Sequence, residues 1–245
     1  MLFSRRRIPV TLLATGLVLI PLLSGISSAT AQTTANVTVS ASMSLHTIKK
    51  GAFGVNTAVW DNSMLDSAVP GLLSKAGITA LRYPGGSTSD VYNWQTNSIV
   101  PGRSSYTDPA NDFDAFMGLA NEVGATPIIT VNYGSNSDGN GGGLPSLAAA
   151  WVQYANVTKG YEVKYWEIGN EVYGNGEYGA TWETDLHSAH DPSTYGANVA
   201  LYASAMKAVD PRIKVGVVLT APGKLARRPG AGLEYKCPCS MRLLN

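Results

Sequence analysis

Short apolar runs alternate with longer segments of helical periodicity between Phe53 and Thr220. This alternation is typical of repeated strand–helix units around a parallel sheet. The apolar runs predict strands at 53–60, 78–83, 126–132, 163–169 and 213–219. The segments between them predict helices at about 63–75, 112–123, 144–157 and 195–209. The body of the chain, residues 53–220, is therefore predicted to contain about four and a half units.

Two arrangements of these units are possible, a barrel or an open doubly wound sheet. Gly77, Gly124 and Gly160 each fall between a predicted helix and the next strand, where a left-handed cap is often needed. No Gly-x-Gly-x-x-Gly follows the first strand, and the run 139–143 lies in a long polar loop. We therefore expect an α/β fold, an incomplete (β/α)8 TIM barrel, rather than a nucleotide-binding sheet.

The N-terminal 31 residues have the composition of a secretory signal peptide. Arg5, Arg6 and Arg7 precede an apolar stretch at 8–23, and Ala29-Thr30-Ala31 forms a small-residue cleavage site. A membrane anchor is the alternative, but prolines interrupt the apolar stretch and it is shorter than the roughly 20 residues of a spanning helix. We predict a secreted or extracytoplasmic protein with no stable membrane span after cleavage. Residues 32–52 are predicted to form an extended N-terminal segment.

Charge and cysteine usage limit the partners and cofactors. From Gln32 to Thr220 the chain has 16 acidic and 10 basic residues with no basic stripe, which argues against nucleic acid as a partner. After Thr220 the composition becomes basic, and both cysteines, Cys237 and Cys239, lie there. A Cys-x-Cys pair with no histidine nearby is a poor zinc site, so we expect no metal and no other cofactor. Residues 221–245 are predicted to be an atypical, disordered tail.

An amide and a carboxylic acid, Asn170 and Glu171, stand side by side where the predicted strand 163–169 ends. A glycosidase needs a carboxyl group that protonates the leaving oxygen, and an adjacent amide can hold a sugar hydroxyl near the reacting carbon. Glu171 is therefore the candidate catalytic acid and Asn170 a candidate sugar-binding residue. The plainer alternative is a polar strand end or a helix cap.

Further polar and aromatic residues follow the other predicted strands. They are Trp60 at the end of the first strand, Arg82 and Trp94 on and after the second, and Asn132 and Tyr133 at the end of the third. In a barrel these positions meet at the carboxyl-end rim, where barrel enzymes do their chemistry, so all five are candidate substrate-binding residues.

Structural alternatives exist for most of these residues. Arg82 could instead pair inside the barrel with Glu167. Glu167 lies on the strand that ends before Asn170-Glu171, and its side chain is predicted on the same side of that strand as Glu171. Trp60, Trp94 and Tyr133 could pack the rim rather than stack on sugar. Asp90, in the loop after the second predicted strand, could be a catalytic acid, but an acid in that position is more often a loop-capping residue.

Four ordered motifs carry a resemblance to a known family. These are Arg-Tyr-Pro-Gly-Gly at 82–86, Val-Asn-Tyr-Gly-Ser at 131–135, the segment 151–156 and Trp-Glu-Ile-Gly-Asn-Glu at 166–171. In order and spacing they resemble the α-L-arabinofuranosidases of glycoside hydrolase family 51, which are (β/α)8 retaining glycosidases. The resemblance implies that Glu171 is the general acid/base, that Asn170 binds the sugar 2-hydroxyl and that Arg82 supports the catalytic carboxylate on the far side of the substrate. It implies an arabinose-containing polysaccharide or oligosaccharide as substrate.

The sequence departs from that family at three points. Ala58 stands where the family usually has a glutamate, and Ser87 where it usually has an asparagine. The family's nucleophile is a glutamate at the end of the seventh strand, whereas the pattern here ends after a fifth predicted strand. We expect a truncated or frame-shifted form that is weak or inactive alone. The alternatives are a non-catalytic carbohydrate-binding half barrel and a partner-dependent structural fragment.

Overall fold

The computed structural model describes residues 35–40, 42–44, 46–49 and 51–220. The predicted signal peptide and tail lie outside these residues. The chain divides into two units, Met1–His46 and Thr47–Asn245. The described part of the first unit, which belongs to the predicted extended segment, contains neither helix nor strand.

Five parallel strands form the main sheet of the second unit, in the order β1-β2-β5-β6-β7. Their bounds are Gly54–Asn56, Ala80–Tyr83, Thr126–Val131, Tyr165–Ile168 and Lys214–Val217. Each strand lies beside the one before it in the chain, without the reversal of order that defines a doubly wound sheet. The predicted α/β fold with a parallel sheet is confirmed, and its strand order is that of consecutive barrel units.

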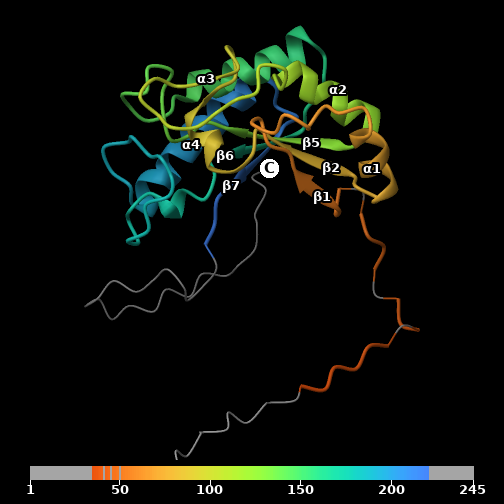
Figure 1. Cartoon of the computed structure of the whole chain (residues 1–245). Coiled ribbons are helices and arrows are strands. Elements are labelled where there is room, and N and C mark those ends of the chain that lie inside the picture. Colours follow the sequence, from red (N-terminus) through yellow and green to blue (C-terminus); the bar gives the residue numbers. More distant parts are fainter. Residues whose placement is uncertain (1–34, 41, 45, 50, 221–245) are drawn as a thin grey trace, which may run out of the picture. The chain divides into compact units, whose positions relative to one another are not determined.

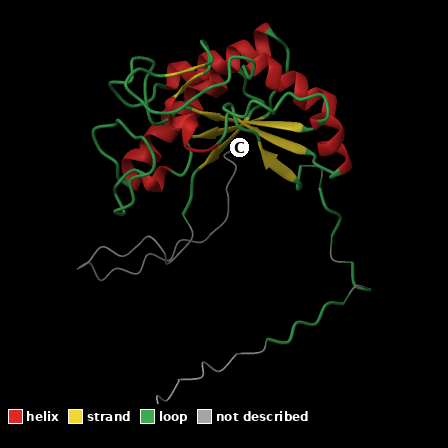
Figure 2. Cartoon of the chain, viewed as in Figure 1, coloured by secondary structure: helices red, strands yellow, loops and turns green. Residues whose placement is uncertain are grey.

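Four helices connect the strands and lie over one face of the sheet (Figures 1 and 2). They are α1 (Val69–Lys75), α2 (Phe113–Val123), α3 (Pro145–Val152) and α4 (Pro192–Val209), and a π-helical turn, Gln153–Thr158, continues α3. Asp112 caps α2 as its carboxylate accepts the amide of Ala115, and Asp191 caps α4 in the same way. Helix α1 begins about six residues later than predicted, because hydrogen-bonded turns occupy 61–68.

The hydrophobic core lies between the sheet and these helices. Alternate strand residues face it and are almost fully buried: Leu81, Tyr83, Ile129, Val131, Trp166, Ile168 and Val215. Burying a large apolar side chain contributes about 1.5–3 kcal/mol, so this layer is the main stabilising feature of the unit. The intervening positions, which point to the other face, include Asn56, Arg82, Thr130 and Glu167. The sheet therefore has one apolar face and one face with polar side chains.

Three short elements beyond the repeated units were not predicted. A 3-10 turn, η1 (Gly86–Val91), follows β2 and leads into a small hairpin of β3 (Tyr92–Asn93) and β4 (Ser98–Ile99). A second turn, η3 (Val172–Gly174), follows β6. All three lie after the carboxyl ends of β2 and β6, so they add polar backbone and side chains there.

Among the described helices, none combines the length and apolar character needed to cross a bilayer.

Candidate active site

Asn170 is held from three directions just beyond the end of β6. Its side-chain oxygen accepts a hydrogen bond from Arg82 Nη2 at 3.1 Å, and its side-chain nitrogen donates to Glu183 Oε1 at 2.7 Å. Its backbone N–H donates to Asp90 Oδ2 at 2.9 Å. Because both ends of the amide have a partner, the orientation of the Asn170 side chain is fixed. The position is buried, with one edge at the rim.

Arg82 connects the strands on the polar face of the sheet. Its Nε donates to Glu167 Oε2 at 2.5 Å, and Thr130 Oγ1 donates to the same oxygen at 3.1 Å. Its Nη1 reaches Asn56 Oδ1 at 3.4 Å. The predicted alternative of an ion pair with Glu167 is therefore present in the structure, and it coexists with the contact to Asn170. One guanidinium thus joins β1, β2 and β6 below the candidate site.

Glu171 is exposed and adopts an unusual backbone conformation. Its φ of 38° lies in the left-handed region, which costs a non-glycine residue about 1 kcal/mol or more. Trp182 Nε1 donates to Glu171 Oε2 at 3.0 Å, and the indole packs edge-on to Tyr173 with ring centroids 6.0 Å apart. The pKa of Tyr173 is raised, first by burial and then by a hydrogen bond to Glu171. The strained turn thus presents the candidate acid to solvent between two aromatic rings.

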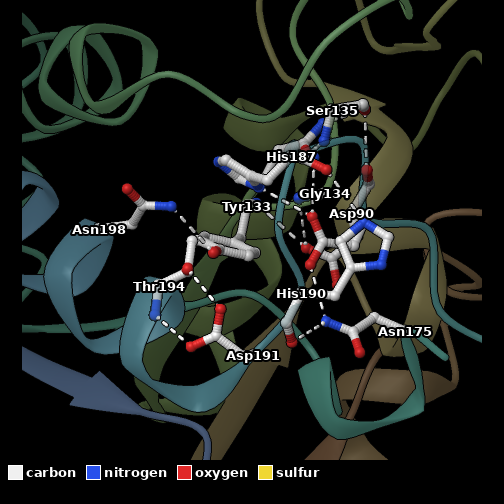
Figure 3. A network of polar contacts seen from close by, with 12 residues as sticks. Asp90, Tyr133, Gly134, Ser135, Asn175, His187, His190, Asp191, Thr194 and Asn198 are labelled. Carbon is white, nitrogen blue, oxygen red and sulfur yellow. Dashed lines mark hydrogen bonds and ion pairs between the residues drawn. The ribbon is translucent and has the colours of Figure 1, made fainter. Parts of the chain in front are cut away.

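Asp90 is a fully buried anchor for the ends of two strands (Figure 3). Its Oδ1 accepts the backbone amides of Tyr133 and Gly134, both at 3.1 Å, and its Oδ2 accepts that of Asn170. Burial and the nearby Glu183 carboxylate raise the pKa of Asp90 to about 8, although the three amides lower it. These contacts correspond to the loop-capping role considered from the sequence, because Asp90 in η1 holds the backbone after β5 and after β6.

Tyr133 and Asn132 are occupied by internal contacts. The Tyr133 ring stacks on His187 with centroids 4.3 Å apart, and its hydroxyl accepts from Asn198 (Figure 3). Asn132 Nδ2 donates to the Tyr92 carbonyl and to Ser135 Oγ, both at 3.1 Å. These contacts support the packing alternative for Tyr133 and give Asn132 a loop-bracing role.

The two predicted tryptophan platforms differ in their surroundings. Trp94 stacks on Trp151 with centroids 5.4 Å apart and planes 6° apart, and its Nε1 donates to the Leu147 carbonyl. Trp60 is exposed and lies beside Gly86 at the start of η1. The structure therefore favours packing for Trp94, whereas the ring of Trp60 is open to a ligand.

Comparisons with known proteins find relatives for part of the chain. No family model matches the chain. A protein of Aspergillus fumigatus named probable α-L-arabinofuranosidase C is 28% identical over 168 residues, covering 58% of this chain and 30% of that protein. The intracellular exo-α-(1→5)-L-arabinofuranosidase of Halalkalibacterium halodurans is 27% identical over 179 residues, covering 63% of this chain and 33% of that protein. This chain contains an arabinofuranosidase-like segment.

A solved structure supports the fold of the arabinofuranosidase-like segment. The family 51 α-L-arabinofuranosidase AbfB from Bifidobacterium longum matches with a TM-score of 0.50 and 23% identity, over 67% of this chain and 37% of that one. The chain thus spans about a third of the length of the curated relatives it matches.

Residues 182–187 contribute to the site and were missed by sequence reasoning. They include Trp182 on Glu171, Glu183 on Asn170, and His187, whose Nδ1 lies 2.8 Å from Asp185 Oδ1. The available signal was the concentration of tryptophan, acids and histidine in one loop run. Among the described residues, no group of three or more metal-binding side chains could hold a metal ion.

Proposed function

We propose that this chain is a glycoside hydrolase of the α-L-arabinofuranosidase type, acting outside the cytoplasm on arabinose-containing polysaccharides or oligosaccharides by a retaining mechanism. The observation that carries the proposal is the pair Asn170 and Glu171, with an oriented amide beside an exposed carboxyl group at the end of β6. The similarity to arabinofuranosidases over more than half of the chain supports the substrate class.

The contacts support a separate task for each residue in this proposal. Asn170 Nδ2 has two hydrogens and uses one on Glu183, so the second can donate to a sugar hydroxyl. Glu171 supplies the proton to the leaving oxygen, and Trp182 holds its carboxyl group. Arg82 keeps the Asn170 oxygen turned away from the sugar, because that oxygen accepts the guanidinium N–H. The amide therefore presents a donor, which suits a hydroxyl oxygen.

The second carboxyl group of the reaction limits the activity that we propose. A retaining glycosidase needs a nucleophilic carboxylate about 5–5.5 Å from the acid. Among the described residues, the acids nearest to Asn170 in the hydrogen-bond network are Asp90, Glu167 and Glu183, and each is engaged by other groups. We therefore propose that the chain binds its sugar and hydrolyses it weakly or not at all when isolated.

Calorimetric titration with arabinoxylan oligosaccharides tests the binding part of this proposal. We expect saturable binding, weakened about 5–10-fold by Asn170→Ala, since a net hydrogen bond of about 1–1.4 kcal/mol is lost. A matched exposed substitution, Glu122→Ala on α2, should leave the affinity unchanged. Absence of binding, or equal binding by the Asn170→Ala variant, would contradict the proposal.

Hydrolysis of an aryl α-L-arabinofuranoside tests the catalytic part. Any activity above background should disappear in the Glu171→Gln variant, while sugar affinity should change little. Efficient turnover by the unmodified chain would contradict the proposed weakness. Turnover that survives Glu171→Gln would remove Glu171 from its role as the acid.

A non-catalytic carbohydrate-binding half barrel is the second candidate function. It is favoured by one observation, the exposure of the two indoles of Trp60 and Trp182, the second of which contacts Glu171. It predicts binding that falls on Trp60→Ala or Trp182→Ala, with no hydrolysis under any condition. Hydrolysis that is lost in Glu171→Gln, however weak, would therefore favour the first candidate over the second.

A further inference from the structure

The dipeptide Trp182-Glu183 faces the dipeptide Asn170-Glu171 residue for residue. Trp182 contacts Glu171, and Glu183 contacts Asn170, at 3.0 and 2.7 Å. The two dipeptides are separated by η3 and a loop, so the chain turns back on the candidate site after leaving it. We propose that Trp182 and Glu183 are positioning residues that clamp the candidate acid and the candidate sugar-binding amide, a role that rests on the proposed function.

Glu183 is built into the site rather than placed at its surface. It is only 7% exposed, and its Oε1 accepts from both Asn170 Nδ2 and Ser87 Oγ, the latter at 2.6 Å. Its other oxygen, Oε2, is buried without a hydrogen-bond partner. Burying a carboxyl group with an unsatisfied oxygen is costly, so this acid is not there for stability alone. Its contacts join η1, the end of β6 and the 182–187 loop at the side chain of Asn170.

A second buried carboxyl group supports the same assignment. Asp90 accepts the backbone amide of Asn170, while Glu183 accepts its side-chain amide, so two acids act on one residue. Their mutual repulsion is seen in the raised pKa of Asp90, to which Glu183 contributes after burial. The pKa of Glu183 is also raised, by burial first and by Glu171 among the charges around it. The two carboxyl groups therefore hold the backbone and the side chain of Asn170, so that its side-chain amide cannot rotate.

Trp182 completes the clamp on the side of the acid. Its indole lies against the backbone of Gly174, where an added Cβ would come within 2.5 Å of the ring. One face of the ring is thus packed, the N–H points at Glu171, and the side chain is still half exposed. A glycine at 174 is required for this approach. The ring therefore fixes the acid while leaving space beside it.

Nuclear magnetic resonance of the full chain tests the clamp without depending on sugar binding. In the unmodified protein the side-chain amide protons of Asn170 should exchange slowly with solvent. Glu183→Ala should accelerate that exchange at least about 10-fold, because the buried acceptor is lost, whereas Glu183→Gln keeps an acceptor oxygen and should restore slow exchange. The Trp182 indole N–H signal should shift in Glu171→Gln and stay in place in Glu122→Ala.

Affinity measurements then connect the clamp with function. Arabinoxylan oligosaccharides should bind about 10-fold more weakly to Glu183→Ala, whereas their affinity for Glu183→Gln should stay within about 3-fold of that of the unmodified chain. Both variants should have melting temperatures well above the temperature of the titration, so that unfolding does not account for the loss of affinity. Unchanged Asn170 exchange in Glu183→Ala, or an unmoved indole signal in Glu171→Gln, would overturn the clamp. If the amide and indole respond as expected but no variant binds sugar, the clamp stands and the proposed function fails.

Discussion

A single carboxyl group, Asp90, ties together the backbone of two strand ends and the residue that we propose grips the sugar. Burial and, after it, the nearby Glu183 raise the pKa of Asp90 to about 8 from an ordinary value near 3.8, although three backbone amides oppose the shift. At neutral pH the protonated form is therefore substantially populated. The contacts of Asp90 are those of a structural acid, but with this pKa its carboxyl group changes its protonation state near neutral pH.

This shift makes a prediction for stability against pH. Because the folded-state pKa lies above the unfolded value, the folded state binds more protons, and the contribution of Asp90 is complete below about pH 4 and is lost as the pH rises towards 8. Glu183, whose pKa is also raised, acts in the same direction. Asp90→Asn cannot titrate, so the stability advantage of the unmodified chain over this variant should shrink between pH 4 and 8.

Urea unfolding at several pH values measures that difference. At pH 5 we expect Asp90→Asn to lower the free energy of unfolding by about 1–3 kcal/mol, since buried backbone amides lose acceptors. A stability difference that grows with pH would refute the assigned direction. A variant of an exposed acid, Asp66→Asn, provides the control, because its side chain lies in an exposed turn.

At the scale of elements, the contact between the end of β5 and the 182–187 loop depends on a glycine. The Gly134 carbonyl accepts the amide of Leu186 at 2.8 Å, and an added Cβ on Gly134 would lie 2.0 Å from the Thr184 carbonyl oxygen and 2.7 Å from the Asp90 side chain. Such an overlap with backbone cannot be relieved by rotating a side chain. The loop that carries Trp182 and Glu183 must therefore move if residue 134 gains a side chain.

Gly134→Ala should consequently lower the free energy of unfolding by about 2–3 kcal/mol and weaken sugar binding, because the loop is displaced from Asn170. Gly118 offers the matched control. It lies within α2 with no atom close to an added Cβ, so Gly118→Ala should raise stability by about 0.5–1 kcal/mol. Thermal or urea unfolding of both variants measures whether the free energy of unfolding falls in Gly134→Ala and rises in Gly118→Ala. Equal effects would show that the Gly134 contact does not constrain the loop.

The elements with clear periodicity were predictable, whereas their ends and the loop contacts were not. Strand β5 and helix α2 match the prediction closely, because a run of alternating or helical period defines them. Helix α4 begins three residues earlier than predicted, at Pro192, since its start is set by the Asp191 cap rather than by its first apolar residue. The spacing of apolar residues along a helix does not reveal a capping residue that lies before the first of them.

The candidate site shows the same division. Asn170 and Arg82 could be placed together because parallel strands bring their carboxyl ends to one edge of the sheet. Glu183 could not, because its partners Ser87 and Asn170 lie 96 and 13 residues away, and the path of the 175–191 loop decides the contact. Trp94 was placed at the rim, but its stacking on Trp151 depends on the unpredicted β3–β4 hairpin, in whose turn Trp94 lies.

At the scale of the whole molecule, the edges of the sheet decide how the chain behaves in solution. Within the described residues β1 and β7 are the end strands of the sheet, and all three residues of β1 are exposed. Val55 is 41% exposed in this strand, and the neighbouring Phe53 is also exposed. An edge strand with apolar side chains offers unpaired backbone groups to another chain. The polar face of the sheet adds half-buried groups that a partner could cover.

We therefore expect concentration-dependent self-association through β1, measurable by light scattering during gel filtration or by sedimentation equilibrium. A lysine in an edge strand opposes pairing, so Val55→Lys should shift the chain towards monomer at a given concentration. Leu72→Lys, at an exposed position of α1, introduces the same charge away from the edge and should have little effect. Equal shifts in both variants would indicate a general charge effect. A chain that stays monomeric at every concentration would mean that β1 is not an association edge, and the partner-dependent interpretation would then lose its structural basis.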